Sequence, residues 1–149
     1  MRLGVDVGTV RVGVAASDPS GRLAVPVTTL RRDLRTGADL DRLADLVRER
    51  SAVQVVVGLP RTLAGAEGAA ALAVRGYATD LAARVTPVPV RLVDERFTTV
   101  TATRGLRAAG VPGRAQRRVV DAAAAVVVLQ GALEAERGTG SAPGELVEV

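Results

Sequence analysis

The pattern of apolar and polar positions predicts three strands at the start of the chain. Apolar residues alternate with others over residues 2–8 and 10–17, and a Gly-Thr pair separates the two runs, which is typical of a hairpin. A third apolar run, Leu23–Leu30, is interrupted by Pro26, which favours an edge strand. We therefore expect the first three strands to form an antiparallel meander.

The apolar period then becomes helical, because Leu40, Leu43 and Leu46 recur at helical spacing, with Thr36 or Asp39 as a possible N-cap. A short apolar run bounded by Gly and Pro signals predicts a buried parallel strand. That strand lies within Val53–Pro60, and the further expected elements are a helix over 66–84, a strand over Val88–Val93, and helices over Thr98–Ala109 and Ala115–Glu136.

The resulting order, βββαβαβαα, predicts an α/β fold in which a mixed five-stranded sheet carries flanking helices. A chain of 149 residues suits one domain, which we assign to residues 1–137, followed by a flexible C-terminal tail over 138–149. No apolar run approaches the roughly 18 residues of a membrane span. The start of the chain is strand-like and does not resemble a signal-peptide core, so we expect a cytoplasmic protein with no membrane partner.

The amino-acid composition limits the kinds of catalytic and metal-binding groups that this chain can use. Cysteine and histidine are both absent, so disulfides, thiolate metal sites and imidazole bases are excluded. Acid–base or metal chemistry must then use Asp and Glu, which favours hard cations such as Mg²⁺ or Mn²⁺. All 20 basic residues are arginine and the formal net charge is +4, which is compatible with a polyanionic partner but does not require one.

Asp6 is a carboxylate within an apolar strand, RLGVDVG. Side chains alternate across a strand, so Gly4 and Gly8 share its face and leave room for an ion or a phosphate. The alternative is that Asp6 caps the following turn. Two other acidic positions favour a site: Asp94-Glu95 ends the last expected strand, and Asp121 precedes an alanine-rich helical stretch.

Together, these acidic residues predict one shared function, the binding of divalent metal ions. Carboxylates from three distant segments, with no histidine available, could hold one or two divalent ions that activate water and neutralise the leaving oxygen of a phosphodiester. Periodicity does not choose between Asp94 and Glu95. Asp121 could instead lie on the wet face of an amphipathic helix.

Four stretches in order carry a family resemblance: GVDVGTVRVGVAASD, VVVGLPRTLAGAEG, VRLVDERFTT and DAAAAVVVLQ. Together they closely resemble the YqgF family, also called RuvX, whose RNase H-like members are described as Holliday junction resolvases and as pre-16S rRNA nucleases. The resemblance spans about residues 1–134. It implies an RNase H-like fold and catalytic, metal-binding acids at Asp6, Glu95 and Asp121. The stretch after Gly58-Leu59-Pro60 departs from the family, with Ala64 where Asp is common.

Candidate substrate-binding residues lie beside these motifs. Arg11, Arg61 and Arg96 could each hold a phosphate through two parallel hydrogen bonds, although ordinary surface arginines are the alternative. We assign Thr98 to the same group, while noting that it also suits an N-cap. A further run, Arg114, Arg117 and Arg118, precedes Asp121 and is more typical of a solvated helix face.

The sequence therefore predicts a metal-dependent nuclease that acts on structured nucleic acid. We expect RNA in preference to DNA, and specifically 5′-end processing of pre-16S rRNA within a ribosome precursor, by a monomer or weak homodimer. One alternative is a dimeric Holliday junction resolvase, which needs two paired cuts. Another is a non-catalytic, rRNA-binding ribosome-assembly factor. Sugar kinases also begin with Asp-x-Gly-Thr, but they need a second such domain, which this chain lacks.

Overall fold

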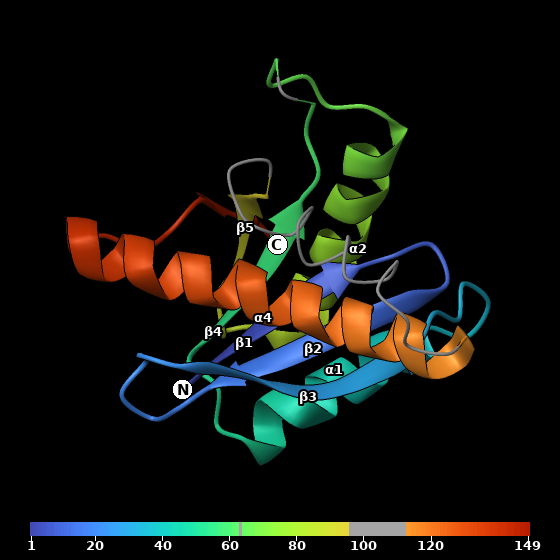
Figure 1. Ribbon diagram of the computed structural model, residues 1–149, viewed down its shortest axis with the longest axis horizontal. Coiled ribbons are helices and arrows are strands. Elements are labelled where there is room, and N and C mark those ends of the chain that lie inside the picture. The colour runs from blue at the N-terminus through green and yellow to red at the C-terminus, as the bar shows by residue number, and fades with distance from the viewer. Residues whose placement is uncertain (63, 96–112) are drawn as a thin grey trace.

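A six-stranded sheet forms the middle layer of the molecule, in the order β3-β2-β1-β4-β5-β6 (Figure 1). The structure is a computed structural model that describes residues 1–62, 64–95 and 113–149, with the backbone alone over 113–121. The strands are β1 Arg2–Val7, β2 Arg11–Ser17, β3 Ala24–Arg31, β4 Gln54–Leu59, β5 Val90–Asp94 and β6 Glu145–Leu146, and the described helices are α1 Ala38–Glu49, α2 Ala69–Val85 and α4 Gly113–Thr139.

Strand pairing confirms the mixed sheet expected from the sequence. β1, β2 and β3 form an antiparallel meander with β3 at the edge, and β1, β4 and β5 run parallel. The short strand β6 pairs antiparallel with β5, inside the segment that the sequence analysis assigns to a tail. The helix expected over Thr98–Ala109 lies outside the described residues. The domain boundary after residue 137 stays a prediction.

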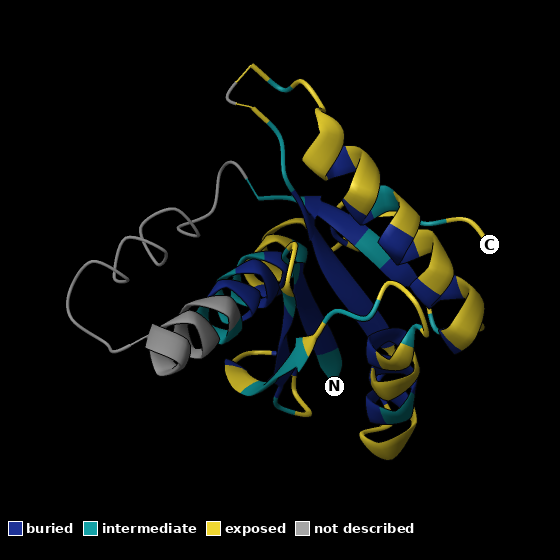
Figure 2. Cartoon of the chain, turned by 90° about the vertical axis from the view of Figure 1, so that its right-hand side faces the viewer, coloured by how far each residue is buried: buried dark blue, intermediate teal, exposed yellow. Residues whose placement is uncertain are grey.

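The two faces of the sheet bury separate cores. Residues such as Leu3, Val5 and Val57 pack with α1 and α2 in one cluster. The opposite face carries Val56 and Val93, which pack with α4 in a second cluster. Figure 1 shows α4 lying across the sheet, and Figure 2 shows the dark, buried strands between the helices on either side. Alternation along each strand thus decides which helix a side chain meets.

Small residues let α4 lie close to β1. Ala124 and Ala125 of α4 are fully buried on the side of the helix that faces the sheet. A methyl group on Gly4 would lie 2.5 Å from Leu129 Cβ and 3.0 Å from the Ala125 carbonyl oxygen. No side chain larger than hydrogen fits at position 4, so this glycine sets the distance between helix and strand.

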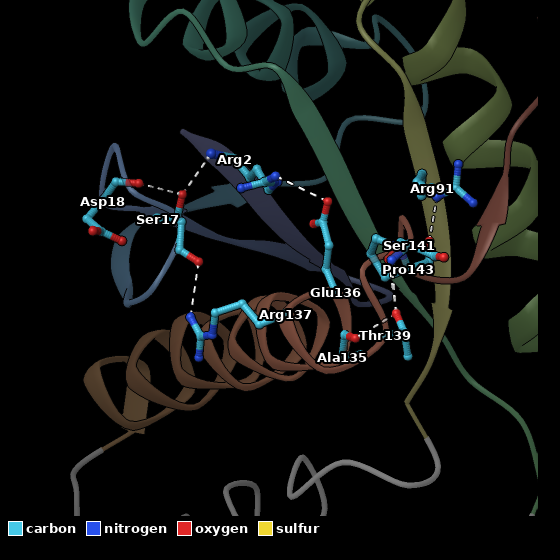
Figure 3. Close-up of polar contacts among 11 residues, drawn as sticks. Arg2, Ser17, Asp18, Arg91, Ala135, Glu136, Arg137, Thr139, Ser141 and Pro143 are labelled. Carbon is cyan, nitrogen blue, oxygen red and sulfur yellow. Dashed lines mark hydrogen bonds and ion pairs between the residues drawn. The ribbon is translucent and has the colours of Figure 1, made fainter.

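Polar contacts hold the far half of α4 and the chain end, as Figure 3 shows. The Arg2 amide donates to Ser17 Oγ at 2.8 Å, and the Arg2 guanidinium pairs with Glu136 of α4 at 3.3 Å. On β5, Arg91 donates to the carbonyl oxygens of Pro143 and, at 2.9 Å, Gly144. The Arg2–Glu136 pair fixes α4 relative to β1 at the end of the sheet opposite to Asp6, and Arg91 fixes the chain end to β5.

The expected capping of α1 is right only in part. The N-cap position is Gly37, with φ of 71°, but Thr36 Oγ1 accepts a hydrogen bond from the Ala38 amide at 3.3 Å. Asp39 instead lies buried inside the first turn, where Tyr77 Oη donates to it at 2.8 Å and the Asp33 amide at 3.2 Å. This carboxylate therefore ties α1 to α2. Among the described helices, none has the length and apolarity needed to cross a membrane.

The close contact at Gly4 predicts that Gly4→Ala destabilises the fold by about 1–3 kcal/mol, because a methyl group forces α4 away from β1. Gly76→Ala is the matched control: Gly76 lies in α2 with nothing within 4 Å of an added methyl group. That control should gain about 0.5–1 kcal/mol from helix propensity. Urea unfolding of both variants measures the difference, and equal stabilities would refute the packing argument.

Candidate active site at the carboxyl ends of the parallel strands

Asp6 lies near the carboxyl end of β1, is 3% exposed, and has glycines around it on its own face of the sheet. Gly4 and Gly8 lie two residues before and after it. Gly13 pairs with it on β2. Gly58 occupies the β4 position that follows the last pair of the β1–β4 ladder. The Asp6 carboxylate is therefore buried on the α4 face of the sheet, where the adjacent positions of β2 and β4 are glycines.

Glu95 reaches the same face from β5. It follows the strand directly, and its amide donates to the Leu59 carbonyl oxygen of β4 at 3.2 Å. A methyl group on Gly58 would lie only 2.7 Å from Glu95 Oε2, so the glutamate carboxylate lies over the face of β4. Neighbouring strands are about 4.8 Å apart, which puts this oxygen about one strand spacing from β1 and Asp6.

The structure thus brings Asp6 and Glu95 to one face, at the carboxyl ends of parallel strands. In open α/β sheets this is the end where ligands bind. Asp94 is in register with Leu59, one position out of phase with Gly58, so it does not share the row of Gly58. This geometry favours Glu95 over Asp94, a choice that periodicity leaves open. Both acids have contacts within the protein.

Asp121 belongs to α4, as expected, one helical turn before Ala124 and Ala125. Those two alanines are buried against the sheet, and the Ala125 carbonyl oxygen approaches Gly4 of β1. The side chain of Asp121 lies outside the described residues. Among the side chains that are described, no group of three acidic residues gathers closely enough to hold a metal ion. The third carboxylate therefore stays a prediction.

Of the predicted substrate-binding residues, some lie within the described part of the chain and the others lie outside it. Arg11 opens β2 and is half-buried. Arg61 follows β4 and pairs with Glu67 at 3.3 Å, and Glu67 also binds Arg75 at 2.6 Å. The hydrogen bond from Arg75, more than the Coulombic effect of the two guanidinium groups, lowers the pKa of Glu67. Outside the described residues lie Arg96, Thr98 and the side chains of Arg114, Arg117 and Arg118.

The sequence analysis missed a residue that supports the turn after Asp6. Arg32 Nη1 donates to the Gly8 carbonyl oxygen at 3.1 Å, and its amide donates to the Val10 carbonyl oxygen at 2.8 Å. Its guanidinium lies 5.3 Å from the centre of the Tyr77 ring. Burial, and then the hydrogen bond to a carboxylate, raise the pKa of Tyr77 far above its ordinary value, so the phenol stays neutral. The turn is thereby held to the helical layer opposite α4.

Comparison with known proteins shows which proteins this chain resembles. A family model described as "RuvX: Holliday junction resolvase" matches residues 1–135. A Frankia casuarinae protein named "Putative pre-16S rRNA nuclease" is 61% identical over 144 residues, which cover 97% of this chain and 71% of that protein. A Streptomyces avermitilis protein of the same name is 57% identical over 149 residues, covering 99% and 94%. The solved "Thermus thermophilus RuvC structure" matches with a TM-score of 0.50 and 17% identity, covering 93% of this chain and 96% of that one.

The fold is that of the RNase H-like class, and the relatives of this chain are named as nucleases. The match over residues 1–135 shows that the chain belongs to the RuvX family, whose members hydrolyse phosphodiesters. The resemblance seen in four sequence stretches is confirmed.

Gly58→Ala should displace Glu95, because the added methyl group would lie 2.7 Å from Oε2 at the flexible end of this side chain; the buried Val128 Cγ2, at 3.0 Å, must shift by only a few tenths of an ångström. A shift of about 1 Å in a catalytic group can lower the rate about 100-fold. Gly68→Ala, in the connection between β4 and α2 with nothing within 4 Å, is the control. Nuclease rates and melting temperatures of both variants test this prediction. A fully active Gly58→Ala variant would show that position 58 does not constrain Glu95.

Proposed function

We propose that this chain is a divalent-metal-dependent nuclease that cleaves structured RNA in the 5′-end processing of pre-16S rRNA. The observation that carries the proposal is the approach of the Glu95 carboxylate over Gly58 toward the buried Asp6. Two relatives that match nearly the whole chain carry a pre-16S rRNA nuclease name, which supports the choice of RNA. We also propose a cytoplasmic location and a monomer or weak homodimer.

The donor set fits a hard cation. Asp6 and Glu95 offer carboxylate oxygens, the ligands that Mg²⁺ and Mn²⁺ prefer. The space above Gly58, which a methyl group would fill, holds one of these oxygens. We propose that Asp6, Glu95 and Asp121 hold the metal. When bound, a divalent cation lowers the pKa of a coordinated water and neutralises charge on phosphate oxygens.

The residues around the site have separate parts in this proposal. The glycine frame, Gly8, Gly13 and Gly58, leaves room for a phosphodiester to approach the carboxylates. Arg11 is proposed to hold the substrate backbone. A phosphate at Arg61 would compete with Glu67, whose main partner is Arg75. Arg96 and Thr98 complete the proposed binding set by their position after the DER motif.

Holliday junction resolution is the second candidate, and the description of the matching family favours it. Resolution needs two active sites at a fixed spacing, hence a dimer with two paired cuts. The distinction therefore depends on both substrate and oligomeric state.

Asp6→Asn, Glu95→Gln and Asp121→Asn should each lower Mg²⁺-dependent cleavage of a precursor 16S rRNA transcript by about 100-fold or more. Loss of a residue that only orients a metal ligand already costs about 10–100-fold, and loss of the ligand itself should cost at least as much. Asp80→Asn removes the same charge from an exposed position of α2 and should retain full activity. The measurements are initial rates with purified protein, with circular dichroism to verify folding.

Full activity in the folded Asp6→Asn variant would overturn the proposal. The same proteins are tested on a four-way DNA junction. Symmetric paired cuts there, by a protein that sediments as a dimer, would instead establish resolution. Tight RNA binding by wild-type protein without cleavage of either substrate would establish a non-catalytic assembly factor.

A further inference from the structure

Two arginines face each other across the β2–β3 ladder. Arg11 and Arg31 are directly paired in the register of the two strands. Val12, the next residue of β2, packs in the core on the α1 and α2 side. Because side chains alternate, Arg11 and its partner Arg31 lie on the opposite face, which is the face of Asp6.

This pair is unfavourable in the free protein. Like charges directly opposite each other in an antiparallel ladder destabilise the sheet. Within the described part of the chain, neither guanidinium has an ion pair or a side-chain hydrogen bond. Other arginines do have carboxylate partners, namely Arg2, Arg42, Arg48, Arg61, Arg75 and Arg84. Neither guanidinium contacts an acid directly; the pKa of Asp33 is lowered mainly by hydrogen bonds from Thr36 and, to a smaller extent, by the charge of Arg31.

The pair lies beside the candidate active site. Asp6, Gly13 and Thr29 form one row across three strands. Arg11 and Arg31 form the next row on the same face, two residues further along, or about 7 Å away. Gly13 precedes Arg11 on this face of β2, whereas Thr29 precedes Arg31 on the same face of β3.

We propose that Arg11 and Arg31 together bind one segment of the sugar–phosphate backbone that leads into the site. A phosphate can accept two parallel hydrogen bonds from each guanidinium, and its charge removes the repulsion between them. Such contacts position the strand without reading its sequence. Arg11 is already a predicted substrate-binding residue, whereas Arg31 is added by this proposal, because no motif in the neighbouring sequence indicates a binding role for it. The inference rests on the proposed function for the identity of the strand, but it concerns binding and not cleavage.

The test uses the full chain with precursor 16S rRNA transcript and, separately, a four-way DNA junction, both without divalent ions. Binding is measured against salt concentration for wild type, Arg31→Gln, Arg31→Lys and Arg50→Gln. Arg50, exposed at the C-cap of α1 on the other side of the sheet, is the matched charge control.

Arg31→Gln should weaken binding about tenfold and reduce the salt slope by about 0.7–0.9, as expected for one lost phosphate contact. Arg31→Lys should retain the slope, and Arg50→Gln should behave as wild type. The melting temperature of Arg31→Gln at low salt should equal or exceed that of wild type, because the like-charge pair is gone. A purely structural arginine would show the reverse, with a lowered melting temperature.

Two results would overturn the inference: unchanged affinity and slope in Arg31→Gln, or weakened binding together with a lower melting temperature. The outcome is separable from that of the proposed function. If wild type binds through Arg31 but never cleaves, the nuclease proposal fails and the arginine pair stands. If cleavage depends on Asp6 while Arg31→Gln binds as wild type, the nuclease proposal stands and the arginine pair fails.

Discussion

The close approach of α4 to β1 is the constraint on which the site depends. With Leu129 Cβ only 2.5 Å from where a methyl group of Gly4 would lie, helix and strand meet almost backbone to backbone. Buried alanines on α4 permit this contact, and the Arg2–Glu136 ion pair supports it from the other end. A helix held this close covers Asp6 and removes it from bulk water. The same helix carries Asp121, so the position of this residue depends on how α4 packs against β1.

The glycines around Asp6 follow from the same constraint. A carboxylate buried to 3% exposure requires compensation, and it has contacts within the protein. A larger residue at Gly58 would meet Glu95 Oε2 and expel the carboxylate from this position. The helical layer on the opposite face holds the backbone of the turn through Arg32, so the carboxylate is fixed from both sides of the sheet. The molecule thus places α1 and α2 on one face of the sheet, and α4 with the candidate site on the other.

Much of this arrangement could be predicted from local sequence. Alternation placed Gly4, Asp6 and Gly8 on one face, and apolar periods predicted β1 to β5 with α1, α2 and α4 in their order, but the five-stranded sheet they predicted lacks the sixth strand, β6. What periodicity cannot supply is register between strands. The roles of Gly13 and Arg31 depend on which residues lie opposite each other, and a bulge between Val14 and Ala15 shifts that pairing. Local signals were right only in part at α1, where Gly37 with positive φ takes the N-cap and the buried Tyr77 recruits Asp39 instead.

The central claim is that Asp6, Glu95 and Asp121 share one divalent cation. The most direct test is a crystal of the full chain soaked in Mn²⁺, with anomalous diffraction recorded at the manganese edge. The account predicts a peak within coordination distance of Asp6 and Glu95 oxygens and of the Asp121 carboxylate, and its loss in an Asp6→Asn crystal. A crystal in which Mn²⁺ binds elsewhere and this face stays empty would contradict the account.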